Sequence, residues 1–391
     1  MGTKFYIARE EDILAGKITD VYFDRTKEII RAKGLEDVKV RLEIHTGGLP
    51  SGYEWAVYAG LEEALHLLKG RNVTVYSLPE GTLIKENFPV MVIEGRYIDV
   101  CELETPLLGI LRHYTSVATK AARFRKLAGS KTVLYFGLRG AHPAISPMLD
   151  RAAYVGGVDG VSGSFNKETI GVTPKGTMPH ALILVFGDEV EAWKAYDEVV
   201  DESVPRIALI DTFNDERFAT MAAVEALGDR LHGVRLDTPK SRRGSMKSII
   251  EEIRWTLKLS GKQHVKIYVS GGLSEKALYE LRDVADGFGV GTSITYPPSV
   301  DMSMDIVEKF VDGSWIPYSK RGKFPGAKAV YRCGVLDYEI VRLETLPTRC
   351  REGLMVKWIE GGEIVREPPT VEDVRDYVLK QLKEVPEPTP T

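Results

Sequence analysis

Two glycine-rich turns stand at the ends of apolar runs in the second half of the chain. The run 265–269 leads into Ser270-Gly271-Gly272, and a later run ends in Gly289-Val290-Gly291-Thr292. Glycine turns leave backbone N–H groups bare, and the first turn precedes a predicted helix with Ser274 as its N-cap. Bare amides at strand ends and at a helix N-terminus bind phosphate dianions. The pair therefore predicts a phosphate site, although either turn alone is explained equally well as an ordinary bend.

Charged residues end the strand-like runs around these turns. Carboxylates could hold ribose hydroxyls or a magnesium ion, and arginines could neutralise pyrophosphate oxygens as negative charge develops. A sugar phosphate with a pyrophosphate leaving group fits this set, and the reaction would be displacement at the anomeric carbon through an oxocarbenium-like state. For any single residue, a helix N-cap or a solvated charge explains the pattern equally well. The residues concerned are Arg139, Asp211, Arg235 and Asp237.

Short apolar runs alternate with helical patterns between residues 129 and 300. Parallel βαβ units produce this alternation, which predicts an α/β fold with a (β/α) barrel-like catalytic domain. In such a barrel, side chains at the carboxyl ends of the strands converge on one mouth, and the last two strand-to-helix loops commonly bind phosphate. The predicted strands are 132–136, 206–210, 233–236, 265–269 and 288–290, and the predicted helices are 147–154, 216–227, 246–259 and 275–285.

The length of 391 residues predicts two or three domains. Residues 1–101 mix helical and strand patterns and predict an N-terminal α+β domain, with helices at 25–33 and 53–68. Residues 102–128 form the longest helical pattern and are predicted to bridge two domains. Residues 301–391 read as a small β-containing extension that returns in part to the N-terminal domain. The end of the chain, 385–391, alternates proline with polar residues and is predicted to be disordered.

Composition excludes several classes of protein. The chain carries 52 basic and 56 acidic residues, and this balance of −4 does not favour nucleic acid or an anionic membrane surface. No apolar run is long enough to span a bilayer, so we expect a cytoplasmic protein. Scarce Asn and Gln beside plentiful Glu, Lys and Arg suggest a thermophilic source. The cysteines are too few for a disulfide framework. Cys333 and Cys350 are predicted to be small buried hydrophobes, with half of a zinc site as the alternative.

Several motifs, in their order along the chain, resemble the nicotinate phosphoribosyltransferase family, the type II phosphoribosyltransferases. The resemblance covers most of the chain, and the strand-end motifs from Asp211 to Thr292 continue it. No one motif is decisive. The motifs are Tyr22-Phe-Asp-Arg25, Glu104-Thr-Pro-Leu-Leu-Gly109, Ser116-Val-Ala-Thr-Lys-Ala-Ala-Arg123, Phe136-Gly-Leu-Arg-Gly-Ala-His142, Asp150-Arg-Ala-Ala-Tyr154, Gly156-Gly-Val-Asp-Gly-Val-Ser-Gly163, Gly176-Thr-Met-Pro-His180 and Lys323-Phe-Pro-Gly326.

The resemblance implies synthesis of nicotinate mononucleotide from nicotinate and phosphoribosyl pyrophosphate, in NAD biosynthesis. It implies that Ser270, Gly271, Gly272, Gly289, Gly291 and Thr292 bind the 5′-phosphate, that Arg139 lies beside the base and the leaving group, and that Arg235 and Asp237 lie near the ribose. Phe136 and Tyr22 would stack on the pyridine ring, with Tyr22 supplied by the neighbouring subunit of a homodimer or larger homo-oligomer. Core packing explains both aromatic residues equally well.

His180 matches a histidine that relatives phosphorylate with ATP, which implies ATP as a co-substrate and magnesium as a cofactor. A histidine that only binds phosphate or caps a helix is the alternative. Quinolinate-specific relatives lack this histidine, so His180 favours nicotinate over quinolinate. Two other functions remain open: a sugar-phosphate isomerase or aldolase, which needs a lysine or glutamate base that these strand ends do not offer, and a non-catalytic metabolite-binding scaffold.

Overall fold

The computed structural model describes residues 4–391; residues 1–3, the start of the predicted N-terminal domain, lie outside it. The chain divides into two compact units. Within the described residues, the first unit consists of 4–119, Val155–Gly157 and Pro298–Pro386, and the second of Lys120–Tyr154, Val158–Pro297 and Glu387–Thr391. Each unit is described by itself below.

The second unit is built on a curled sheet of six parallel strands, in the order β7-β6-β11-β10-β9-β8. Every strand pair in it is parallel, as the alternation of apolar runs and helical patterns predicts. The sheet has two edges, β7 and β8, and therefore forms a half-barrel. Its strands are β6 (Thr132–Tyr135), β7 (Gly160–Val161), β8 (Arg206–Leu209), β9 (Leu231–Leu236), β10 (Lys266–Ser270) and β11 (Gly287–Val290).

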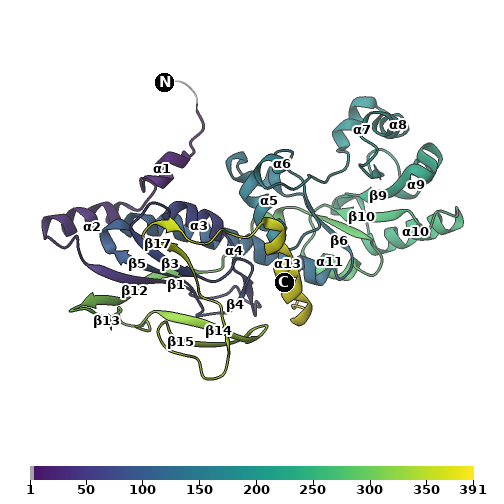
Figure 1. Cartoon of the computed structure of the whole chain (residues 1–391). Coiled ribbons are helices and arrows are strands. Elements are labelled where there is room, and N and C mark those ends of the chain that lie inside the picture. The colour runs from purple at the N-terminus through teal and green to yellow at the C-terminus, as the bar shows by residue number, and fades with distance from the viewer. Residues whose placement is uncertain (1–3) are drawn as a thin grey trace. The chain divides into compact units, whose positions relative to one another are not determined.

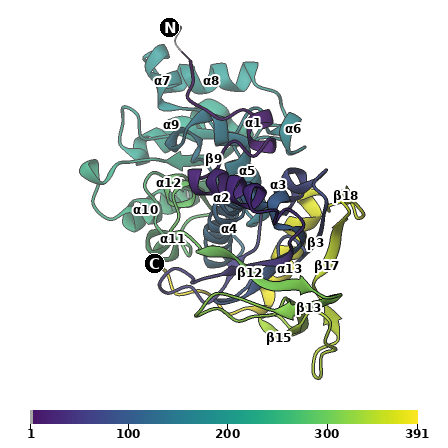
Figure 2. The same ribbon diagram turned by 90° about the vertical axis from the view of Figure 1, so that its left-hand side faces the viewer.

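Helices follow these strands, and several begin at side-chain caps. Asp188, Asp215, Ser245 and Ser274 each accept a backbone N–H of the helix that follows. Helix α9 packs against α8 and α10, and α9 and α10 lie beside the strands (Figures 1 and 2). The helices are α5 (Ser146–Val155), α6 (Asn166–Thr169), α7 (His180–Phe186), α8 (Glu189–Val199), α9 (Glu216–Leu227), α10 (Met246–Leu259), α11 (Glu275–Leu281) and α12 (Thr292–Thr295).

The first unit is built on a seven-stranded antiparallel sheet, in the order β13-β12-β1-β5-β3-β17-β18. Helix α3 lies over β3 and β5 in Figure 1, and its leucines share a buried core with those strands and with the start of α4. The strands of the sheet are β1 (Lys39–Thr46), β3 (Val73–Ser77), β5 (Pro89–Arg96), β12 (Met302–Val311), β13 (Ser314–Pro317), β17 (Val356–Glu360) and β18 (Glu363–Ile364). Segments from both ends of the chain thus share one sheet.

Two smaller sheets and five helices complete this part of the chain. The two-stranded sheet pairs β2 (Ala56–Val57) with β4 (Leu83–Ile84). The three-stranded sheet has the order β15-β14-β16, with β14 (Lys328–Gly334), β15 (Asp337–Arg342) and β16 (Glu352–Gly353). The helices are α1 (Glu10–Leu14), α2 (Val21–Ala32), α3 (Leu61–Leu68), α4 (Glu104–Leu127) and α13 (Val371–Glu384). Helix α4, the long helix predicted at 102–128, supplies residues to both units.

The structure corrects the predicted helix 53–68. Only Leu61–Leu68 is helical, and Ala56–Val57 forms strand β2. Gly60 separates the two elements with a φ of +95°, a conformation that glycine adopts without strain. Its N–H donates to the buried carboxylate of Glu80 at 2.7 Å, so the backbone polar group at this break is satisfied.

The chain end at 385–391 is ordered, and the prediction of disorder is wrong. The backbone N–H and the hydroxyl of Thr391 both donate to the Glu275 carboxylate, at 2.9 and 3.0 Å. Glu387 forms an ion pair with Arg282. Specific polar contacts therefore outweigh the disordering tendency of its proline-rich composition.

The cysteine prediction also needs correction. Cys333 and Cys350 form a disulfide across 17 residues, and Cys333 is exposed rather than buried. Neither sulfur is then a free thiolate for zinc, and residues 4–391 contain no group of three or more His, Cys, Asp or Glu side chains placed to hold a metal ion. Over the same residues, no helix is long and apolar enough to cross a membrane.

Candidate active site

The predicted residues of the second unit gather at the carboxyl ends of adjacent strands. Along the sheet, Phe136 follows β6, Gly289 lies in β11, Ser270 ends β10, Asp237 follows β9 and Asp211 follows β8. Parallel strands place all their carboxyl ends at one edge of a sheet. One mouth therefore carries an aromatic ring, glycine turns and two carboxylates, as the sequence predicts.

His180, the first residue of α7, faces both carboxylates. Its Nε2 lies 3.7 Å from Asp211 Oδ1 and 3.8 Å from Asp237 Oδ2, while its Nδ1 is 3.1 Å from the hydroxyl oxygen of Thr212. The side chain is 37% exposed. The imidazole is therefore held on one side by a hydroxyl, with its other nitrogen turned toward two acids and accessible to a ligand.

Asp211 is the buried member of this group. Its side chain is 2% exposed, and its Oδ2 accepts the backbone N–H of Asp237 at 2.7 Å and the hydroxyl of Thr238 at 3.1 Å. Its Oδ1 is buried without a hydrogen-bond partner. Burial raises the pKa of this carboxyl above its ordinary value, although the backbone of Asp237 and the His180 ring oppose the shift. Asp211 thus holds the strand end in place and leaves one oxygen available to the site.

Arg235 projects from β9 into the same mouth. Its Nη1 donates to the Thr177 hydroxyl at 2.5 Å, and its Nη2 donates to the Met178 carbonyl at 3.1 Å. Burial, together with the charge of Arg139, lowers the pKa of this guanidinium below its ordinary value. The two nearby aspartates oppose the shift. Arg139 itself is exposed on the turn after β6. Two cations in one mouth favour an anionic ligand.

The glycines bring backbone very close to functional side chains. A Cβ on Gly271 would lie 2.5 Å from Asp237 Oδ1, and a Cβ on Gly289 would lie 2.5 Å from the ring of Phe136. Gly271 and Gly272 have φ values of +88° and +64°, which side chains rarely adopt. Gly291 and Thr292 continue the second turn into α12. The first turn therefore needs glycine for close approach and for backbone conformation, and the second needs glycine at position 289 for close approach.

Tyr22 belongs to the first unit, on helix α2, where its side chain is 54% exposed and its ring contacts Phe23. The other predicted site residues all belong to the second unit. That the Tyr22 ring stacks on the pyridine ring of the substrate therefore stays a prediction.

Sequence reasoning gave no role to two threonines that hold this site together. Thr212 bonds the ring of His180, and Thr177 bonds the guanidinium of Arg235. The position of Thr177 in the motif Gly176-Thr-Met-Pro-His180, and that of Thr212 directly after Asp211, were the available signals. Neither signal specifies the partner, because 32 residues separate Thr212 from His180 and 58 separate Thr177 from Arg235.

Comparisons with known proteins identify the family. The family "Quinolinate phosphoribosyl transferase" matches with its N-terminal domain at residues 20–115 and its C-terminal domain at residues 117–305. The nicotinate phosphoribosyltransferase pncB2 of Mycobacterium tuberculosis is 30% identical over 345 residues, which cover 83% of this chain and 72% of the relative. The chain belongs to the type II phosphoribosyltransferase family.

Solved structures agree with this assignment. A nicotinate-nucleotide pyrophosphorylase from Pyrococcus furiosus is 49% identical, with a TM-score of 0.94 over 98% of this chain and 99% of the other. Human nicotinic acid phosphoribosyltransferase has a TM-score of 0.74 at 20% identity, over 95% and 96% of the two chains. The second likeness shows that the fold of this family persists at low sequence identity.

Proposed function

We propose that this phosphoribosyltransferase acts in NAD biosynthesis and transfers a phosphoribosyl group from phosphoribosyl pyrophosphate to nicotinate. The ring nitrogen of nicotinate would attack C1 of the ribose, the C1–O bond to pyrophosphate would break, and nicotinate mononucleotide and pyrophosphate would leave. The observation that carries the proposal is the mouth itself, where His180, Asp211, Asp237 and Arg235 meet beside two glycine turns. The names of the relatives support nicotinate as the base.

The glycine turns fit the 5′-phosphate of the substrate. Gly271 and Gly272 are exposed, and their positive φ values turn the backbone sharply at the end of β10. The stretch from Gly289 to Thr292 begins in the adjacent strand β11 and runs beyond its end at Val290. Two neighbouring turns of this kind can surround a phosphate with backbone amides, which supports assigning Ser270, Gly271, Gly272, Gly289, Gly291 and Thr292 to it.

Arg139 and Arg235 would stabilise the negative charge that develops on the leaving pyrophosphate. The oxygen donors beside them suit magnesium, which binds through one or two carboxylates together with substrate phosphates. Asp237 is partly exposed and Asp211 has one oxygen without a partner, so these two carboxylates fit such an ion. A magnesium ion bound there would neutralise part of the pyrophosphate charge.

His180 supports coupling to ATP. With its proton on Nδ1 beside the Thr212 hydroxyl, Nε2 would carry a lone pair toward the open side of the site. Attack of that nitrogen on the terminal phosphorus of ATP would form an N–P bond, break the P–O bond to the β-phosphate and release ADP.

Phe136, packed over Gly289, would form one face of the base site. In a homodimer, Tyr22 of the neighbouring copy would form the other face.

A product assay tests the proposal. Purified protein is incubated with magnesium, phosphoribosyl pyrophosphate and either nicotinate, nicotinamide or quinolinate, each with and without ATP. We expect nicotinate mononucleotide from nicotinate, with ATP stimulation that His180→Ala abolishes. Lys258→Ala, an exposed change on α10, serves as the matched control. If only quinolinate yields a mononucleotide, the substrate is quinolinate and not nicotinate. If no base yields a mononucleotide, the transferase activity proposed here is refuted.

A further inference from the structure

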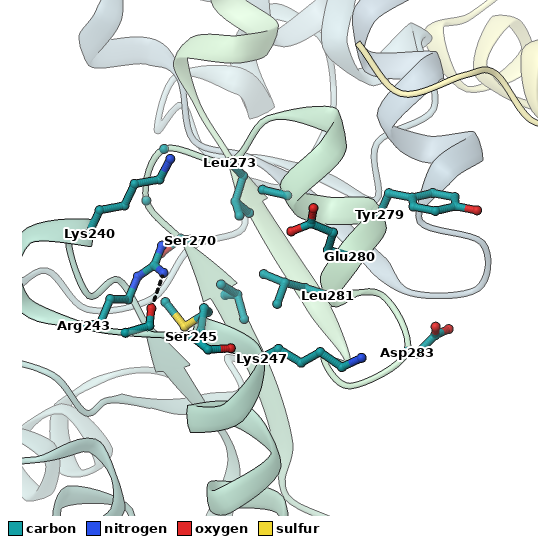
Figure 3. Close-up of a pocket in the computed structure, with 16 residues that line it drawn as sticks. Lys240, Arg243, Ser245, Lys247, Ser270, Leu273, Tyr279, Glu280, Leu281 and Asp283 are labelled. Atoms are coloured by element: carbon teal, nitrogen blue, oxygen red, sulfur yellow. Dashed lines mark hydrogen bonds between the residues drawn. The ribbon is translucent and has the colours of Figure 1, made fainter.

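A cavity of about 610 Å³ opens beside the end of β10. The segment after β9, the first turn of α10, the residues Ser270-Gly271-Gly272 and helix α11 line it (Figure 3). Gly289, Phe136 and His180 do not line it. The cavity therefore shares the glycine turn after β10 with the predicted 5′-phosphate site, but not the turn after β11.

Three cationic side chains line the cavity: Lys240, Arg243 and Lys247. Arg243 donates only to backbone carbonyls, those of Thr238 at 3.0 Å and Gly244 at 3.4 Å. Within residues 4–391, none of the three forms an ion pair with a carboxylate. Figure 3 shows Lys240 and Arg243 on the same side of the cavity as Ser270. Clustered cations without a protein anion favour an anion from solution.

The charge in the cavity is unevenly distributed. Glu280 and Asp283, at the far end of α11, line the opposite part of the same space. The exposed glycines 271 and 272 lie at the cationic part, where the N-terminus of α10 adds its own partial positive charge. An anionic group is therefore favoured beside Lys240 and Arg243, whereas neutral hydroxyl or amino groups suit the end near Glu280.

We infer that Lys240, Arg243 and Lys247, beside the turn at Gly271 and Gly272, form a second anion subsite that binds a polyphosphate chain. The inference deepens the proposed function and rests on it, because the proposed reaction uses ATP and releases pyrophosphate, and both contain a polyphosphate chain. Arginine and lysine together suit such a chain, since one offers a planar fork and the other a point charge. The cavity volume lies in the range of small-molecule sites.

The subsite adjoins the proposed reaction centre through one residue. Gly271 packs against Asp237, whose other carboxylate oxygen lies 3.8 Å from His180 Nε2. A polyphosphate held by the three cations would thus lie on the far side of Gly271 from the imidazole. The proposed transfer of the phosphoribosyl group assigns no role to Lys240, Arg243 or Lys247.

Calorimetric titration of the full-length protein with three probes tests the inference: inorganic pyrophosphate, a non-hydrolysable ATP analogue and phosphoribosyl pyrophosphate. The double variant Lys240→Ala with Arg243→Ala should bind pyrophosphate or the ATP analogue roughly 10-fold more weakly, because two charge-assisted contacts are lost. Its affinity for phosphoribosyl pyrophosphate should stay close to that of the wild type. Lys258→Ala, at the exposed end of α10, should leave all three affinities unchanged.

The probe that loses affinity in the double variant identifies the source of the polyphosphate, which is either the nucleotide or the released pyrophosphate. Unchanged affinity for both probes, a wild-type protein that binds neither, or an equal loss for phosphoribosyl pyrophosphate would overturn the inference. The product assay separates this result from the proposed function. Mononucleotide synthesis with unaltered polyphosphate binding in the double variant refutes only the subsite. Polyphosphate binding that depends on the two cations, without mononucleotide synthesis, refutes only the transferase.

Discussion

The chemistry of the candidate site depends on how individual polar groups are held. His180 is positioned by the hydroxyl of Thr212, and Arg235 by the hydroxyl of Thr177 and the carbonyl of Met178. A single hydrogen bond of this kind contributes roughly 0.5–1.5 kcal/mol. The contribution is small for stability, but it decides which nitrogen of the imidazole faces Asp211 and Asp237.

Thr212→Val keeps the shape of the side chain and removes the hydroxyl that holds His180. We expect the ATP-stimulated rate to fall roughly 2- to 10-fold, the equivalent of one hydrogen bond, while the rate without ATP stays near that of the wild type. Steady-state kinetics with and without ATP measures both rates, and Thr212→Ser should restore the stimulation. An equal loss with and without ATP would mean that Thr212 acts on the site as a whole and not through His180.

Asp150 is fully buried in α5, and burial raises the pKa of its carboxyl to about 6. Because the unfolded pKa lies near ~3.9, the folded protein binds the extra proton between these values, and its stability falls as pH rises through that window. Asp150→Asn should therefore increase the free energy of unfolding by roughly 3 kcal/mol at pH 7.5 and by little near pH 4. Urea unfolding at both pH values checks this, and an equal effect at the two would contradict it.

At the scale of elements, the short helix α11 is tied to its surroundings through its first residue. Glu275 is fully buried and accepts hydrogen bonds from Lys120 at 2.6 Å, from Arg123 at 2.9 and 2.8 Å, and from Thr391. Burial alone would raise the pKa of this carboxyl, but the bonds from Arg123 and Lys120 outweigh it and lower the pKa. The cluster fixes the element that directly follows the Ser270–Gly272 turn.

Glu275→Gln removes the anion from this cluster while Lys120 and Arg123 stay buried. Breaking a buried ion pair costs roughly 3–5 kcal/mol, so we expect a loss of stability of that order at pH 7. Because the pKa of Glu275 is lowered, the wild-type contribution is present at neutral pH and lost as pH falls below the usual carboxyl range.

Thermal and urea unfolding measure the Glu275→Gln effect, and the KM for phosphoribosyl pyrophosphate should rise as the turn before α11 loosens. Lys276→Ala changes the next, exposed residue of the same helix and is the matched control. A Glu275→Gln protein as stable as the control would show that the cluster does not hold α11 in place.

At the scale of the whole molecule, the proposed base site combines residues of different units. Phe136 belongs to the second unit, and Tyr22 is exposed on α2 of the first. The resemblance to the family assigns Tyr22 to the neighbouring subunit, which makes the proposed homodimer a requirement for catalysis.

Co-expression of Tyr22→Ala with His180→Ala chains tests this arrangement. If Tyr22 acts in the partner's site, each mixed dimer contains one intact site, and about one quarter of the wild-type sites should return after random association. The measurement is ATP-stimulated synthesis of nicotinate mononucleotide by the co-purified dimers, compared with each variant alone. Activity no higher than that of the separate variants would place Tyr22 and His180 in the same chain's site, or Tyr22 outside it.

The sequence by itself determined the elements whose formation depends on local pattern. Helices α9 and α10 have the predicted bounds, because Asp215 and Ser245 cap them and apolar residues recur at helical spacing. The strand ends of the half-barrel, and with them Asp211, Asp237 and the two glycine turns, follow from the same alternation of strands and helices. Parallel strands bring their carboxyl ends to one edge whatever the loops between them contain.

Only the tertiary structure decided which distant groups meet. It broke the predicted helix 53–68 at Gly60, where Glu80 receives the backbone N–H, and it ordered the chain end through Glu275. It also paired Cys333 with Cys350 and brought Thr212 to His180 and unpaired cations to the turn at Gly271. Each of these contacts joins groups far apart in sequence, and their energies depend on burial and distance, which local pattern does not encode.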